Sequence, residues 1–223
     1  MKYEEFSDKE VEKFLKTKIA NQKNSIAEKG QIIQEGQVQM LESDNGEEKN
    51  IYFIDKENIH NNSLQVTNQY ETDTGAHTNR YDVTILVNGF PLVHMELKKR
   101  GVDIKEAFNQ INRYQRDSFW SGSGLFEYVQ IFIISNGTYT KYYSNTTRDR
   151  HVSNATASAV KPNRKTSDTF EFTSWWADAN NTPITDLTDF ARTFLTKHSI
   201  LNILTKYCVF TADNSLLVMR PYQ

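Results

Sequence analysis

Three polar residues, Asp82, Glu96 and Lys98, have the types and spacing needed for phosphate chemistry if their side chains meet. Two adjacent carboxylates repel one another, and a divalent cation between them relieves that repulsion. Mg²⁺ prefers oxygen ligands, and it commonly takes one or two carboxylates together with a substrate phosphate. A lysine beside them would orient or deprotonate a metal-bound water, or neutralise charge on the phosphate in the transition state. These residue types indicate a metal-dependent phosphodiesterase.

The segment that positions these side chains consists of two β-type runs around Asn88-Gly89, which predicts a β-hairpin. Apolar residues occupy alternate odd positions of both runs: Val83, Ile85, Val87, Val93, Met95 and Leu97. A shared core requires odd positions to pair with odd, and the tightest such register sets Asp82 opposite Glu96. A strict two-residue turn would pair Asp82 with Met95. We therefore expect a longer loop at residues 88–90 or a glycine bulge at Gly89.

The same polar residues also have a purely structural interpretation. A solvated strand face often carries Asp, Glu and Lys, and Glu96 and Lys98 would then form a surface ion pair that contributes little. An acidic residue two positions before a lysine is very common, so the hairpin alone leaves both interpretations open.

Composition limits the class of protein. The chain has 223 residues, enough for one large domain or two small ones, and its net charge of −2 gives no overall basic field for nucleic acid. Cys208 is the single cysteine, so an internal disulfide is impossible and a reducing compartment is expected. No apolar run approaches the length of a membrane span, and the N-terminus has no signal-peptide pattern.

A helix is predicted directly after the hairpin. Asp103 is a plausible N-cap with Glu106 at the reciprocal position, and the buried side is formed by Ala107, Phe108, Ile111 and either Tyr114 or Gln115. Gln110 and Tyr114 are four residues apart and share a face. They are either a core aromatic with a hydrogen-bonded neighbour or a pair that faces the carboxylates. Lys105, Arg113 and Arg116 make this helix locally basic.

The remaining elements complete a mixed sheet. A nearly continuous apolar run at residues 128–134 predicts a strand buried on both faces, and residues 138–143 follow it after a turn. The order strand, strand, helix, strand predicts a helix that crosses one face of the sheet. Further elements are expected as a helix at 7–18, strands at 38–41, 51–54 and 64–67, helices at 187–196 and 198–206, and paired strands at 207–210 and 216–219.

Three segments are expected to be loops. Residues 71–79 are loop-like, as are residues 43–50. Residues 145–168 are rich in Ser, Thr, Asn, Arg and Lys, which predicts an exposed loop. Its basic residues would either contact DNA phosphates or simply be solvated: Arg148, Arg150, Lys161, Arg164 and Lys165.

Several of these motifs, in this order, resemble a known family. The run from Arg80 through Lys98, the segment from Glu106 to Tyr114, and Ile134-Ser135-Asn136-Gly137 are similar to the nuclease core of the type I restriction enzyme R (HsdR) subunit. The closing segment Leu217–Gln223 resembles the entry to that subunit's ATP-driven motor. The similarity is seen from about Asn50 to the end of the chain.

The resemblance implies an α/β (α+β) fold, with a restriction-endonuclease-like mixed central β-sheet flanked by helices. It implies a PD-(D/E)xK site with Asp82, Glu96 and Lys98 as catalytic residues and Mg²⁺ bound by Asp82, Glu96 and the carbonyl of Leu97. It maps the family's Q-x-x-x-Y element to Gln110 and Tyr114, with Arg113 beside them to contact DNA.

The resemblance also implies the organisation and partners. Residues 1–223 would be a nuclease region with its core at about 50–144, an exposed loop at 145–168 and a C-terminal helical part at 169–223 that leads to a motor. The partners would be double-stranded DNA and the methyltransferase (M) and specificity (S) subunits, in the cytoplasm. ATP would bind only to the motor, because the sequence has no Gly-x-x-x-x-Gly-Lys-Ser/Thr loop. A further family helix with an acidic residue is expected before Met1, and Glu12 is not assigned to that role.

Three hypotheses remain at this level. The first is a Mg²⁺-dependent endonuclease domain that cuts double-stranded DNA non-specifically within a type I complex, after ATP-driven translocation. The second is a related PD-(D/E)xK nuclease of repair or phage defence without those partners. The third is a docking module of the same fold that has lost the chemistry.

Overall fold

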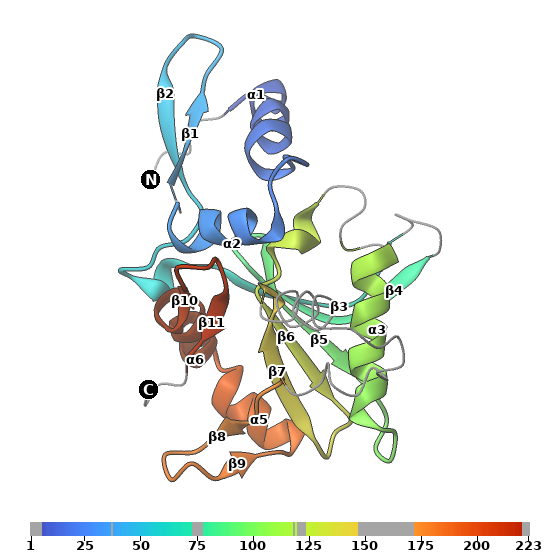
Figure 1. Ribbon diagram of the computed structural model, residues 1–223. Helices are drawn as coiled ribbons and strands as arrows, with labels where there is room; N and C mark the ends of the chain where they lie inside the picture. The colour runs from blue at the N-terminus through green and yellow to red at the C-terminus, as the bar shows by residue number, and fades with distance from the viewer. Residues whose placement is uncertain are drawn as a thin grey trace.

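A five-stranded mixed sheet with the order β3-β4-β5-β6-β7 forms the centre of the computed structural model, which describes residues 6–36, 38–72, 78–117, 119, 124–146 and 172–219 (Figure 1). The strands are β3 (Leu64–Thr72), β4 (Asn79–Val87), β5 (Phe90–Leu97), β6 (Ile131–Ser135) and β7 (Thr140–Ser144). The β5–β6 pair is parallel and the other three pairs are antiparallel. The predicted fold class, a mixed α+β sheet flanked by helices, is confirmed.

The β4–β5 hairpin has the register that the apolar pattern predicted. Val83 pairs with Met95 and Ile85 with Val93, so odd positions face odd positions and the next step of the ladder sets Asp82 opposite Glu96. These apolar side chains join one core cluster. The hairpin is therefore oriented by the burial of its odd face.

The way the hairpin reaches this register differs from the prediction of a longer loop or a bulge at Gly89. Val87 pairs with Phe90, so the turn is a two-residue Asn88-Gly89 turn, and both residues have the positive φ of a type I′ turn. The register shifts between Ile85 and Leu86, where Leu92 is left as an extra residue in β5. The bulge lies inside the strand because Asn-Gly closes the tight turn at little cost.

Helix α3 (Ile104–Asp117) connects β5 to the parallel strand β6 and covers one face of the sheet (Figure 1). The side chain of Asp103 accepts the Lys105 amide at 3.0 Å, as expected of an N-cap. The predicted inner face of α3 is buried in a second core cluster, with Ala107, Phe108, Ile111 and Tyr114. All five residues of β6 are buried, as its apolar run predicted.

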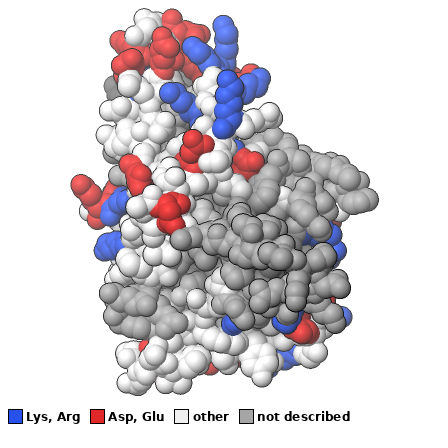
Figure 2. Space-filling view, in the orientation of Figure 1, with Lys and Arg blue, Asp and Glu red and all other residues white. Residues whose placement is uncertain are grey.

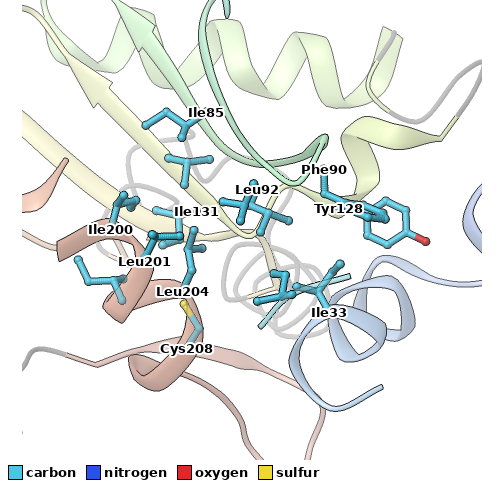
Figure 3. Close-up of a cluster of buried hydrophobic side chains, with 14 of the residues drawn as sticks. Ile33, Ile85, Phe90, Leu92, Tyr128, Ile131, Ile200, Leu201, Leu204 and Cys208 are labelled. Carbon is cyan, nitrogen blue, oxygen red and sulfur yellow. The ribbon is translucent and has the colours of Figure 1, made fainter. Parts of the chain in front are cut away.

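The opposite face of the sheet packs against α2 (Ile26–Gln34), α5 (Leu187–Phe194) and α6 (Lys197–Asn202). Figure 3 shows part of this cluster, where Ile33, Ile131, Ile200, Leu204 and Cys208 converge from helices, sheet and C-terminal hairpin. Burial raises the pKa of the Cys208 thiol to about 12, so it stays protonated. The C-terminal elements therefore share one core with the sheet.

The N-terminal elements confirm some predictions and correct others. Helix α1 (Asp8–Phe14) starts with a capping box between Ser7 and Glu10 and continues as a π-helix, η1 (Leu15–Ile19). Strands β1 (Val38–Glu42) and β2 (Glu48–Tyr52) form an antiparallel hairpin. The loop predicted at 43–50 is therefore shorter, and the strand predicted at 51–54 starts earlier and ends at Tyr52. Helix α2 was not predicted, because its inner face includes the polar residues Lys29 and Gln34.

Other boundaries also move. Strand β3 continues to Thr72 because its ladder with β4 extends to the Thr72–Asn79 pair, so both ends of the loop predicted at 71–79 are strand. The strand predicted at 128–134 begins at Ile131, after a 3₁₀ turn, η3 (Leu125–Tyr128). The predicted C-terminal hairpin is present as β10 (Cys208–Phe210) and β11 (Leu216–Val218).

The described residues also form four short elements outside the central sheet. The pair β8 (Trp176–Ala177) and β9 (Pro183–Ile184) precedes α5, a second π-helix (Ile203–Tyr207) follows α6, and a 3₁₀ turn (Ile59–Asn61) precedes β3. The exposed loop predicted at 145–168 lies outside the described residues except for its first two, Asn145 and Thr146, and these are buried. Its five basic residues, residues 121–123, residues 220–223 and the side chain of Arg116 also lie outside the described part.

Candidate active site

Asp82 and Glu96 lie at the same end of the β4–β5 hairpin, just past the Val83–Met95 pair. The Leu97 backbone amide donates to Asp82 Oδ2 at 2.8 Å, while the next amide, that of Lys98, donates to Ser135 of β6 at 2.8 Å. The Asp82 side chain thus accepts the hydrogen bond of the Leu97 amide in place of a backbone carbonyl of β4. This contact places the Asp82 carboxylate beside Leu97, between the two predicted residues Glu96 and Lys98.

Lys98 links β5 to helix α3. Its Nζ donates to Glu96 Oε1 at 2.8 Å and also to Gln110 Oε1. The Glu96 side chain is fully buried and that of Lys98 is 21% exposed. The solvated-face interpretation is therefore wrong for Glu96. A buried carboxylate that keeps its charge needs partners, and Lys98 supplies one of them.

Gln110 and Tyr114 continue the same hydrogen-bonded chain. Gln110 Nε2 donates to the Tyr114 hydroxyl, which donates to the Arg80 carbonyl at 2.7 Å. Burial raises the pKa of Tyr114 to about 12, and the Glu96 and Asp82 carboxylates add to that increase. The hydroxyl therefore stays neutral, and both sequence interpretations hold for Tyr114: it is a core aromatic and it adjoins the carboxylates.

One oxygen of the site has no hydrogen-bond partner in the described part of the chain. Glu96 Oε2 is buried and unpaired, and His94 Nε2, which is also buried and unpaired, lies 3.8 Å from it. A buried unsatisfied carboxylate oxygen is costly, and it is a common sign of an absent ion or water. The described ranges contain no group of three or more His, Cys, Asp or Glu that could hold a metal. A cation here would rest on two carboxylates and backbone or water oxygens.

Two features near the site were missed by the sequence reasoning. His94 lies two residues before Glu96 on the same strand face, and Thr84, its cross-strand partner, contacts His94 Nδ1 at 3.2 Å. The period-two pattern that selected Glu96 and Lys98 also includes His94. Gln69, in the gap of the β3–β4 ladder opposite Asp82, has a φ of +53°, a conformation uncommon outside glycine. No sequence signal indicated it.

The arginines near the site are single residues with separate contacts. Arg113 is exposed and its guanidinium lies 5.9 Å from the centre of the Tyr114 ring, whereas Arg100 pairs with Asp186 at 3.1 Å. The face of the molecule in Figure 2 has acidic side chains at the tip of the β1–β2 hairpin and basic ones beside it, and its described residues form no continuous basic surface. Glu12 pairs with Lys16 on the exposed side of α1 and takes no part in the site. None of the described helices has the length and apolarity needed to cross a bilayer.

The fold and site define a class of protein: a mixed α+β sheet with a buried carboxylate–lysine pair at the end of its central hairpin. A model of the family described as "Type I restriction enzyme R protein N terminus" matches residues 2–151. The chain belongs to this family. The match begins well before Asn50, so the similarity covers more of the N-terminal region than the motifs indicated.

Curated relatives agree with this assignment. The chain is 47% identical over 220 residues, or 98% of its length, to the type I restriction enzyme EcoprrI endonuclease subunit of Escherichia coli. It is 39% identical over 184 residues, 82% of its length, to the SsaAORF53P endonuclease subunit of Staphylococcus saprophyticus. The chain spans 64% of the first relative and 17% of the second. The relatives support a role in a restriction system.

Proposed function

We propose that this chain carries the Mg²⁺-dependent nuclease centre of a type I restriction enzyme R subunit, which hydrolyses phosphodiester bonds of double-stranded DNA without sequence preference. The observation that carries the proposal is the chain of contacts from Gln110 through Lys98 to Glu96, whose second oxygen is buried and unpaired. A purely structural ion pair would not require that oxygen to be left without a donor.

The residues present fit a magnesium ion. Asp82 uses Oδ2 for the Leu97 amide and Glu96 uses Oε1 for Lys98, so each carboxylate has a second oxygen to offer. Asp82, Glu96 and the Leu97 carbonyl would hold the ion, with waters and a phosphate oxygen completing its ligands. When bound, the ion would polarise the phosphate and lower the pKa of a coordinated water.

Lys98 would position the attacking water and neutralise charge that develops on the phosphate. The structure supports this role, because the ammonium is held by two acceptors at the partly exposed edge of the site rather than extending into solvent. Fixing Nζ in advance limits the entropy that would otherwise be lost when the substrate binds.

Gln110 and Tyr114 would keep Lys98 in place. The Gln110 amide is oriented by the Tyr114 hydroxyl, which is itself anchored on the Arg80 carbonyl, so the order of donors and acceptors fixes the amide oxygen toward Lys98. Arg113, exposed beside Tyr114, would contact a DNA phosphate. Such a contact adds affinity without reading sequence.

The wider role is also a proposal. The relatives are named as endonuclease subunits of type I enzymes, which favours action with M and S subunits in the cytoplasm over a separate repair or phage-defence nuclease. ATP would act through a motor region outside these 223 residues, and translocation would precede cutting. Recognition of the DNA target would belong to the S subunit.

Calorimetric titration with Mg²⁺ tests the site directly. The chain should bind the ion, and Asp82→Asn and Glu96→Gln should each abolish that binding. Asp82→Asn should leave the thermal unfolding temperature of the ion-free chain similar or higher, because a carboxylate repulsion is removed. A chain that folds but binds neither Mg²⁺ nor Mn²⁺ would instead be a docking module. Co-purification with a methyltransferase separates the type I role from the other nuclease role.

A further inference from the structure

We propose that His94 is a positioning residue for Glu96, with its Nε2–H facing the free carboxylate oxygen. The proposal rests on the proposed metal site and adds a residue to it. Its basis is that two buried unpaired atoms, His94 Nε2 and Glu96 Oε2, face each other at 3.8 Å. A shift of about 1 Å would bring them within normal hydrogen-bond distance.

The tautomer follows from the other side of the ring. His94 Nδ1 lies 3.2 Å from the Thr84 hydroxyl, which has one proton and can either donate or accept. If Nδ1 carried the proton, Nε2 would present a lone pair to the Glu96 oxygen, and the two would repel. If Thr84 donates to Nδ1, then Nε2 carries the proton and the contact with Glu96 is attractive. The arrangement therefore selects the Nε2–H tautomer.

The ring itself is held by an aromatic cage. The His94 ring is fully buried, and its centre lies 5.1 Å from that of Phe119, 5.7 Å from Tyr81 and 6.2 Å from Phe132 and Tyr114, all nearly edge-on. These contacts leave the ring little freedom to rotate. The direction of Nε2–H is thereby fixed from β4, α3 and β6 at once.

Glu96 is then oriented from both sides. Lys98 engages Oε1 from the partly exposed edge, and His94 faces Oε2 from the interior. A carboxylate oxygen can accept a hydrogen bond and still ligate a metal, because it has two lone pairs. Hydrogen bonds behind a ligating carboxylate typically change metal affinity 10- to 100-fold when they are removed.

The test compares variants of His94 by Mg²⁺ calorimetry on the 223-residue chain. His94→Phe keeps an aromatic ring in the cage and removes both nitrogens, so Mg²⁺ affinity should fall roughly 10-fold or more. His94→Gln places an amide nitrogen near the position of Nε2 and should recover part of the affinity. Thr84→Val, which removes the hydroxyl that selects the tautomer, should weaken binding less. His60→Phe, at an exposed histidine, is the matched control and should have no effect.

The outcomes separate this inference from the proposed function. If Asp82→Asn abolishes Mg²⁺ binding but His94→Phe and Thr84→Val bind as tightly as wild type, the metal site stands and the role of His94 is wrong. If wild type binds no Mg²⁺, both proposals fail. Long-range ¹H–¹⁵N spectra of the histidine ring provide a readout without metal. They should show the Nε2–H tautomer for His94, and an Nδ1–H signal would overturn the inference even if Phe at this position unfolded the chain.

Discussion

Lys98 Nζ lies 2.8 Å from Glu96 Oε1, with Glu96 inside β5 and Lys98 directly after the end of that strand. The Lys98 amide still donates to the Ser135 carbonyl of β6, so the backbone stays aligned with the sheet there, and extended residues two apart point the same way. What distinguishes this ion pair from a common surface pair is its burial and its third member, Gln110, which comes from the helix that crosses the sheet.

Replacing Lys98 should abolish cutting without affecting the motor. In a complete R subunit assembled with M and S, Lys98→Ala should lower the rate of plasmid cleavage by at least about 100-fold, the usual contribution of a positioned acid–base group. ATP hydrolysis should continue. Lys99→Ala changes the exposed neighbouring lysine and should cut normally. Normal cleavage by Lys98→Ala would refute the assignment.

Removing the Tyr114 hydroxyl should weaken both the fold and the site. Tyr114→Phe leaves the Arg80 carbonyl and the Gln110 amide without their partner, so urea unfolding should show a loss of about 1 kcal/mol or more. Cleavage should fall less than in Lys98→Ala, because Lys98 remains. Tyr139→Phe, at an exposed tyrosine, is the control. Equal stability of the two variants would mean that the buried hydroxyl contributes nothing.

The hairpin turn should depend on Gly89. Its φ is +88°, which a side chain disfavours, so Gly89→Ala should lower the free energy of unfolding by about 1–2 kcal/mol although a Cβ there would meet no neighbour. Gly36→Ala, at a glycine without a positive φ, should cost less. A harmless Gly89→Ala would show that the turn is not in the observed conformation.

Acid should destabilise the N-terminal region through Glu10. The hydrogen bond from Ser43, followed by those from the Asp44 and Ser7 amides, lowers its pKa from 4.5 to about 2. The folded state therefore binds fewer protons than the unfolded chain between these values. The stability due to Glu10 is complete above about pH 4.5 and is lost as the pH falls toward 2.

Thermal unfolding from pH 6 to pH 3 measures this effect. Wild type should lose stability over that range, and Glu10→Gln should be less stable at pH 6 but lose less on acidification, because the titrating group is gone. An unchanged pH dependence in Glu10→Gln would place the acid sensitivity elsewhere.

The elements of the site were predictable because they depend on local patterns. The alternation of apolar residues fixed the hairpin register, and the capping signal at Asp103 with the buried stripe of Ala107 and Ile111 located the helix. The meeting of Lys98 with Gln110 required only that this helix cross the sheet next to β5. The roles of these residues in metal binding and catalysis remain predictions.

What could not be predicted depends on partners distant in sequence. Helix α2 buries Lys29 and Gln34, whose partners are Glu127, Gln130 and the Leu204 carbonyl, so its inner face does not look apolar. Likewise, nothing next to His94 in the sequence indicates that aromatic rings from three other segments enclose it.

The extra residue at Leu92 separates two requirements that would otherwise conflict. The tight Asn-Gly closure alone would bring Asp82 opposite Met95 and send Glu96 to the far side of the sheet, whereas the inserted residue shifts the second strand by one position before the acids are reached. The loop end of the hairpin can therefore have a tight turn, while at the opposite end the side chains of the two acids stay in phase, on the same face of the sheet. A further residue inserted into β5 between the turn and Glu96, or one deleted there, would break that phase.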